Sequence, residues 1–122
     1  MNGKLLLDTN IVIAIFAGDI AVKTSLAGAN EVFVPSIALG ELYYGAHKSS
    51  RVEANIVRIN EFAASSSVLT CDTETSQEYG RLKNSLRIKG RPIPENDIWI
   101  AAIAKQYELT LVSRDEHDSK NT

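Results

Sequence analysis

One stretch decides the fold: Lys4-Leu5-Leu6-Leu7-Asp8-Thr9-Asn10-Ile11-Val12-Ile13. Its first apolar run has the length of a buried strand, which we expect at residues 5–8. The second run continues to Ala17, and this length favours a helix with Asn10 as its N-cap. Asp8 then stands at the carboxyl end of a parallel strand, where open α/β sheets place their binding sites.

Short apolar runs alternate with helical patterns along the rest of the chain. We expect strands at residues 5–8, 32–34, 68–71 and 109–112. We expect helices at residues 10–17, around Val22 and Leu26, at 37–47 with Ser36 as N-cap, at 51–64, from the cap Asp72 to Gly90, and at 98–104. This alternation predicts an α/β fold, a three-layer α/β/α sandwich with a central, mainly parallel sheet.

The composition describes a single domain and excludes several classes of protein. The chain has 122 residues, of which 44% are hydrophobic, so it can form a core. No apolar run approaches the roughly 20 residues of a membrane span, and Asp8 interrupts the only segment that resembles a signal peptide. The single cysteine, Cys71, permits no intrachain disulfide and suits the cytoplasm; we expect it to be a buried small hydrophobe.

Four acids stand where apolar surroundings make a carboxylate costly. Asp8 and Asp115 each follow a strand, Asp97 lies in the first turn of an apolar helix, and Glu41 lies one turn into another. Parallel strands bring Asp8 and Asp115 to the same edge of the sheet. Gly45, on the helix face of Glu41, is a poor helix former, and we expect close packing to explain it.

A hard divalent cation would compensate such a group of carboxylates, because Mg²⁺ is bound through oxygen and keeps several waters. Such ions activate water in phosphodiester cleavage. Each acid alone has an ordinary alternative, since an aspartate after a strand often only caps the next helix, as we expect for Asp72. The joint arrangement of the four acids is what favours a metal site.

The charge pattern bears on nucleic-acid binding. The formal net charge of −2 argues against non-specific binding, but setting the four acids aside leaves 13 basic against 11 acidic residues. Candidates for contacts with RNA phosphates are Arg87, Lys89, Arg91 and Arg114. Lys83, Arg87, Lys89 and Arg91 also fit a solvated helix face with a basic last turn, which suits the helix dipole. On the evidence of these four residues alone, the solvated face is the favoured interpretation.

Four blocks of sequence together resemble the PIN-domain family, and within it the VapC-type toxins of bacterial toxin–antitoxin pairs. The blocks are Leu6-Leu7-Asp8-Thr9-Asn10, Ser36 with Glu41-Leu42 and Gly45, Pro94-Glu95-Asn96-Asp97, and Leu111-Val112-Ser113-Arg114-Asp115-Glu116-His117. Their order and spacing are more specific than any one block, and the resemblance covers nearly the whole chain.

The resemblance implies a PIN-like fold and a Mg²⁺- or Mn²⁺-dependent endoribonuclease. It implies an acidic quartet of Asp8, Glu41, Asp97 and Asp115, with Asp8 and Asp97 as direct metal ligands. Ser113 and Asn10 would orient water or a carboxylate. The resemblance also implies a homodimer, an RNA substrate, and inhibition by a small cognate antitoxin that covers the site.

The end of the chain departs from the pattern of the family. We expect residues 1–117 to form a single PIN-like domain and residues 118–122 a polar tail. Similar proteins usually place an aromatic residue after the Asp-x-His segment and continue into a last strand, whereas Asp118 here begins a polar run. This altered tail puts the last sheet edge in question but leaves all four acids in place.

Two other functions compete with the nuclease hypothesis. Asp8 could be the nucleophile of a phosphatase-like enzyme, but that chemistry wants an acid two residues later, where Asn10 stands. The chain could instead be a catalytically silent domain that only binds a partner protein, which the altered tail motivates. Retention of all four acids favours the nuclease over the silent domain.

Overall fold

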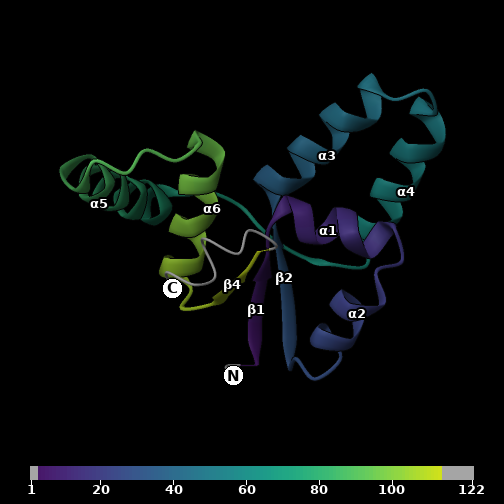
Figure 1. Cartoon of the computed structure of the whole chain (residues 1–122), viewed down its shortest axis with the longest axis horizontal. Coiled ribbons are helices and arrows are strands. Elements are labelled where there is room, and N and C mark those ends of the chain that lie inside the picture. The colour runs from purple at the N-terminus through teal and green to yellow at the C-terminus, as the bar shows by residue number, and fades with distance from the viewer. Residues whose placement is uncertain (1–2, 114–122) are drawn as a thin grey trace.

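The computed structural model describes residues 3–113, which form a parallel sheet between two layers of helices (Figure 1). Its strands are β1 (Lys4–Leu7), β2 (Glu31–Pro35), β3 (Ser67–Leu69) and β4 (Thr110–Val112). They are ordered β3-β2-β1-β4, and every pair is parallel. The helices are α1 (Thr9–Phe16), α2 (Ile20–Leu26), α3 (Ser36–Lys48), α4 (Val52–Ala64), α5 (Thr73–Lys89) and α6 (Glu95–Gln106).

The central strand β1 buries both of its faces, because successive side chains of a strand point to opposite sides. Leu6 is paired in register with Phe33 of β2 and Leu111 of β4, and these side chains pack with Ile100 and Ile103 of α6. The opposite face of the sheet is covered by other helices.

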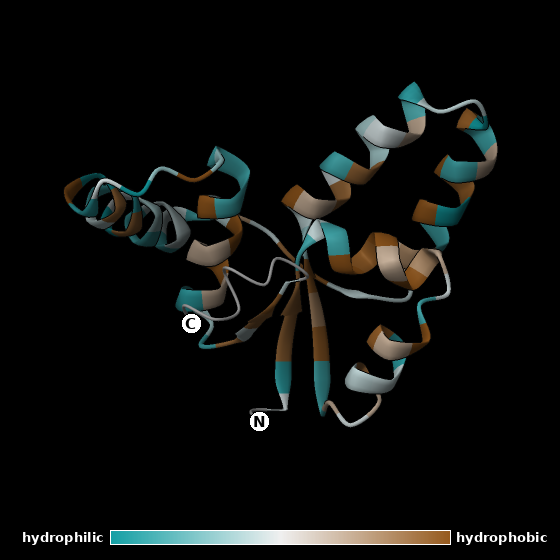
Figure 2. Cartoon of the chain, in the orientation of Figure 1, coloured by the Kyte–Doolittle hydropathy of each residue, from teal (hydrophilic) through white to brown (hydrophobic). Residues whose placement is uncertain are grey.

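Leu7 points to that opposite face. It belongs to a cluster with Val34 of β2, Val12 of α1, Leu39 of α3 and Ile59 of α4. Figure 2 shows that most of the length of the two central strands is made of apolar residues. The three-layer α/β/α sandwich predicted from the alternating pattern is therefore confirmed.

The predicted cap of the first helix is wrong by two residues. Asp8 caps α1, because its carboxylate Oδ1 accepts a hydrogen bond from the backbone N–H of Ile11 at 2.9 Å. Asn10 already lies inside the helix. Aspartate and asparagine are both good caps. Asp8, which directly follows β1, is the residue whose side chain reaches a free N–H group of the first helical turn.

Helix α3 also begins earlier than predicted, by one residue. Ser36 is the first residue of α3, and Pro35 occupies the cap position without a side-chain hydrogen bond. The expectation for Cys71 is likewise wrong: β3 ends at Leu69, and Cys71 is exposed in the segment that follows. Because β3 is short and Asp72 already caps the next helix, Cys71 lies in the connection between them and outside the apolar core.

No single helix within residues 3–113 has the length and apolar composition to cross a bilayer. Helices α1 and α2 reach that length and composition only when they are taken together, and the pair is bent by 116°.

Helices α5 and α6 are joined by a polar network at the end far from the acids. Asp72 caps α5 as predicted, and hydrogen bonds from the Thr75 N–H and the Gln106 side chain hold the pKa of its carboxyl below the ordinary value. The hydroxyl of Thr75 accepts a hydrogen bond from the N–H of Asp72 at 3.0 Å and donates one to the side-chain oxygen of Gln106. Thr75 is fully buried.

Replacing Thr75 with valine should destabilise the protein by about 1–3 kcal/mol. The substitution keeps the shape of the side chain but removes, at a fully buried position, the hydroxyl that links the N–H of Asp72 to the side-chain oxygen of Gln106. Urea denaturation would measure the loss, and Thr73→Val, at an exposed position of the same helix, should change stability by no more than about 0.5 kcal/mol. Equal stabilities for the two variants would show that the network does not hold the helices together.

Candidate functional site

Asp8 is held in place by its neighbours on two sides. Its backbone N–H donates to the carbonyl of Val112 on β4 at 3.2 Å, and its carboxylate caps α1. The side chain is half-buried. Asp8 is therefore fixed at the carboxyl edge of the sheet, as the opening stretch predicted, and one of its oxygens is already engaged with the helix.

Glu41 is connected to this edge through Thr9. The hydroxyl of Thr9 donates a hydrogen bond to Oε1 of Glu41 at 2.5 Å, across 32 residues of sequence. Because Thr9 directly follows Asp8, the bond fixes the Glu41 carboxylate of α3 near the end of β1. Thr9 was not among the predicted site residues. The feature of the sequence that could have indicated its role is a hydroxyl between the candidate site residues Asp8 and Asn10.

Asp97 directly follows Asn96, a residue that lines a cavity together with residues of α3. It stands in the first turn of α6, where its N–H donates to the carbonyl of Pro94 at 3.0 Å, and its side chain is exposed. Its neighbour Asn96 and Glu41 line one cavity of about 590 Å³. The start of α6 and the acidic face of α3 thus share a common space.

The other predicted site residues differ in how close they lie to Asp8 and in whether the structure describes them. Ser113 follows β4 directly and is half-buried, next to the carbonyl of Val112 that binds the Asp8 N–H. Asn10 is exposed in the first turn of α1. Asp115 and Arg114 lie outside the described residues. Within residues 3–113, no three acidic, histidine or cysteine side chains form a group close enough to hold a metal ion.

The donor chemistry nevertheless fits a hard cation. Asp8 and Glu41 offer carboxylate oxygens at one edge of the sheet, where the Thr9 hydroxyl orients Glu41. Asp97 offers a further carboxylate in the first turn of α6. Mg²⁺ takes one or two direct carboxylates and fills its remaining positions with water, so it does not require three carboxylates in contact. Soft ligands for zinc are not part of this set.

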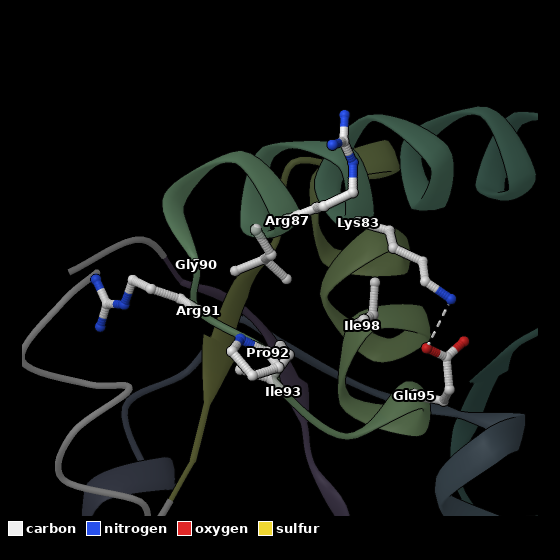
Figure 3. A pocket seen from close by; sticks show the side chains of 9 residues that line it. Lys83, Arg87, Gly90, Arg91, Pro92, Ile93, Glu95 and Ile98 are labelled. Atoms are coloured by element: carbon white, nitrogen blue, oxygen red, sulfur yellow. Dashed lines mark ion pairs between the residues drawn. The ribbon is translucent and has the colours of Figure 1, made fainter.

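Two of the predicted phosphate-binding residues, Arg87 of α5 and Arg91 shortly after it, line a different cavity. Lys89, the last residue of α5, is exposed and is not part of that lining. Arg87 and Arg91 border a space of about 310 Å³ with apolar walls that include Ile93 and Ile98 (Figure 3). Arg87 donates to the side-chain oxygen of Asn84 at 2.8 Å. The structure therefore groups Arg87 and Arg91 with each other and assigns them to a cavity other than that of Glu41.

A polar network beside this second cavity fastens the first turn of α6 to α5. Lys83 forms an ion pair with Glu95 at 3.0 Å, as Figure 3 shows, and donates to the Tyr79 hydroxyl at 3.0 Å. The hydrogen bond with Tyr79 raises the pKa of Lys83, and the bond that Tyr79 donates to Glu95 lowers the pKa of Glu95. The Tyr79 ring stacks on Trp99 at 4.0 Å. Sequence analysis missed this network, which holds the turn that carries Asp97.

A third cavity, of about 340 Å³, runs between α1, α3 and α4. Glu41 lines it as well as the cavity beside Asn96, so the two spaces meet at this carboxylate. Its wall includes Ile13, which is 50% exposed. Arg58 closes one end, with its guanidinium 4.7 Å from the centre of the Phe16 ring.

Gly45 is not explained by close packing, contrary to the prediction. A Cβ built at Gly45 would have no heavy atom within 4 Å outside its own helix backbone, because the residue faces the two cavities that Glu41 borders. Its backbone is helical and exposed. The absence of a side chain therefore keeps space open next to the acids.

Gly45→Ala should stabilise the isolated chain by about 0.5–1 kcal/mol, since glycine in a helix interior loses more backbone freedom on folding than alanine. Gly80→Ala is a matched control, because Gly80 lies in the middle of α5 with equally open surroundings. Thermal denaturation of both variants checks the expectation. Stabilisation by Gly80→Ala together with destabilisation by Gly45→Ala would reveal a packing constraint at Gly45.

Comparison with known proteins identifies the family. Residues 5–120 match the PIN domain. The chain is 39% identical over 113 residues to ribonuclease VapC2 of Haemophilus influenzae, which covers 90% of this chain and 85% of the relative.

Solved structures agree with this match. The fold resembles VapBC2 of Rickettsia felis bound to a DNA fragment from its promoter, with a TM-score of 0.86, 30% identity, and coverage of 96% and 91% of the two chains. It also resembles VapBC-5 of Mycobacterium tuberculosis, a member of the VapBC family of toxin–antitoxin systems, with a TM-score of 0.73, 26% identity, and coverage of 90% and 83%. The chain therefore belongs to the PIN-domain family and, within it, to the VapC proteins.

Proposed function

We propose that this protein is a metal-dependent endoribonuclease toxin that a small antitoxin protein holds inactive. The observation that carries the proposal is the bond from Thr9 to Glu41, which brings a second carboxylate to the strand end where Asp8 stands. Relatives that are named ribonucleases support the reaction class, and solved VapBC assemblies support the antitoxin partner.

Asp8 and Asp97 would hold Mg²⁺ or Mn²⁺ directly, and Glu41 and Asp115 would complete the site directly or through water. The bound ion would lower the pKa of water and neutralise charge that develops on the phosphate.

The side chains of the protein have separate tasks in hydrolysis. A carboxylate of the quartet accepts the proton of the attacking water, which must approach the phosphorus opposite the leaving oxygen. Thr9 keeps Glu41 turned toward the strand end, and Ser113 and Asn10 orient water or a carboxylate. The resemblance to the PIN-domain family implies that the 3′ oxygen is the leaving group. When the bond between phosphorus and this oxygen breaks and the oxygen takes up a proton, one product carries a 3′-hydroxyl and the other a 5′-phosphate.

The cavity between α1, α3 and α4 is the site we assign to the antitoxin. Its wall is mostly apolar, includes the half-exposed Ile13, and ends at Glu41. A peptide bound there would reach the acids and could block them. We further propose that the toxin is a homodimer and acts on RNA in the cytoplasm.

Mapping of cleavage sites on cellular RNA tests the proposed function. The purified chain should cut RNA with added Mg²⁺ or Mn²⁺, stop when a chelator is added, and leave 5′-phosphate ends. Asp97→Asn is the control, because it replaces one carboxylate in an exposed first turn and should cut no faster than background. Cleavage that continues in excess chelator would contradict the proposal, and tight antitoxin binding without any cleavage would favour the silent binding domain.

A further inference from the structure

Helix α3 carries an exposed aromatic side chain along the cavity that Glu41 borders. Tyr44 is 66% exposed, and it lines the same space of about 590 Å³ as Glu41 and Asn96. A single exposed tyrosine is ordinary on a protein surface. Its position in the same cavity as Glu41, and the groups around it, distinguish Tyr44 from such a residue.

Lys48 lies over the Tyr44 ring, with its Nζ 4.6 Å from the ring centre, and it lines the same cavity. A cation–π contact at an exposed site is worth about 0.5–1 kcal/mol. Stacking of a nucleobase on an aromatic side chain is worth about 1–3 kcal/mol. A base can therefore displace the ammonium from the ring, and the ammonium is then available for the phosphate of the same nucleotide.

The space around the ring suits a flat ligand. Gly40 and Gly45 flank Tyr44 on α3, and a Cβ built at either glycine would meet no heavy atom within 4 Å. Both glycines line the cavity with Tyr44. The two glycines add no side chain to this cavity, so the Lys48 side chain is the group that a base has to displace from the ring.

The spacing along α3 matches the scale of a nucleotide. Tyr44 follows Glu41 by three residues, which is about 4.5 Å of helix rise. Stacked nucleotides are about 3.4 Å apart along one strand. Residues three apart also lie on the same face of a helix, and Glu41 and Tyr44 line the same cavity. A phosphate held near Glu41 would therefore have a neighbouring base within reach of Tyr44.

We propose that Tyr44 and Lys48 form a nucleotide subsite, in which the Tyr44 ring stacks an unpaired base next to the scissile phosphate and Lys48 contacts a backbone phosphate. The inference rests on the proposed function, since it assumes an RNA substrate. Stacking reads no base edge, so the subsite favours single-stranded over paired RNA without selecting one base. The charged and polar neighbours Glu41, Lys48 and Asn96 fit a nucleotide better than an apolar protein surface.

The test measures binding of a fluorescent oligoadenylate of about 12 nucleotides, a length within the footprint of single-strand binding proteins. Anisotropy is recorded with the full chain in excess chelator, so that binding is separated from cleavage. Tyr44→Ala should weaken binding by about 5- to 150-fold, the equivalent of lost stacking, at every salt concentration. Tyr44→Phe should restore most of the affinity.

Two further variants separate stacking from charge. Lys48→Gln should lower the slope of log affinity against log salt by about 0.7, the value for one phosphate contact on a single strand, while Tyr44→Ala should leave the slope unchanged. Tyr107→Ala is the matched control, because Tyr107 is 42% exposed at the end of α6 and lines none of the three cavities described above. It should bind as the parent does.

An oligonucleotide with abasic residues completes the cycle. The parent should lose affinity for the abasic strand, and Tyr44→Ala should lose little more. If Tyr44→Ala binds the base-containing strand as tightly as the parent, the subsite is overturned; if it also weakens self-association in sedimentation, Tyr44 is a protein contact instead. Because the assay contains no metal, failure of the parent to cut RNA in a separate Mg²⁺ assay would overturn the proposed function without deciding the subsite.

Discussion

Asp8→Asn should lower the rate of RNA cleavage by at least about 100-fold while the protein remains folded. Even groups that only orient a metal ligand typically change metal affinity or activity by about 10–100-fold, and Asp8 is proposed as a direct ligand. The fold should persist because asparagine caps helices about as well as aspartate. The amide oxygen can still accept the hydrogen bond from the Ile11 N–H.

Two further variants separate the chemical role of Asp8 from its role as a cap. Asp19 caps α2 in the same way, with its carboxylate accepting from the Val22 N–H at 3.1 Å. Asp19→Asn should therefore leave cleavage unchanged. Asp8→Ala should lose cleavage as Asp8→Asn does and also lose about 0.5–2 kcal/mol of stability with the cap. Cleavage by Asp8→Asn at the parental rate would remove Asp8 from the site.

Leu6→Ala should destabilise the protein by about 2–5 kcal/mol, the range for such truncations in well-packed cores. Leu6 is fully buried at the centre of β1, between Phe33 and Leu111 on the neighbouring strands, and it packs against α6. Few other atoms can move to fill the cavity that the substitution leaves, because β1 is hydrogen-bonded to a strand on each side. This loss is a large share of the 5–15 kcal/mol that stabilises a typical domain.

Chemical denaturation of parent and variant measures this loss directly. Ile88→Ala is the control, because Ile88 is 69% exposed on α5 and should change stability by no more than about 0.5 kcal/mol. For Leu6→Ala the denaturant concentration at the midpoint should fall, while the dependence of the unfolding free energy on denaturant (the m-value) should not change. This combination reports a loss of stability with no change in the surface exposed on unfolding. A loss below 1 kcal/mol would mean that α6 does not pack on β1 as described.

The order of strands and helices was predictable because each apolar run had an unambiguous length. Strands of three to five residues and helices of seven or more differ clearly in pattern. The position of Asp8 at a strand end followed from the same reasoning. Even the cap of α5 at Asp72 was predictable, since an aspartate between a strand and a helical stripe has few alternatives.

Details that depend on competition between neighbours were not predictable. Asp8 and Asn10 are both good caps, and only the geometry of the β1–α1 turn decides for Asp8. Gly45 looked like a close-packing residue, but the cavities beside it come from helices distant in sequence. The bond from Thr9 to Glu41 joins residues 32 positions apart, a distance that no local pattern reports.

The sequence therefore proposes a set of candidate site residues but not their geometry. The sequence indicates which carboxylates stand at costly positions. It does not indicate that Glu41 would border two cavities at once, or that α5 would hold the first turn of α6 through Lys83 and Glu95. These features arise only when the helices are packed.

The most direct test of the account is the rate of RNA cleavage as Mg²⁺ is titrated into metal-free protein, for the parent and for Asp97→Asn. The account predicts no cleavage before Mg²⁺ is added, a saturable rise in rate for the parent, and a rate for Asp97→Asn at least about 100-fold lower at every Mg²⁺ concentration. A parental rate that does not depend on Mg²⁺, or equal rates for the two proteins, would contradict it.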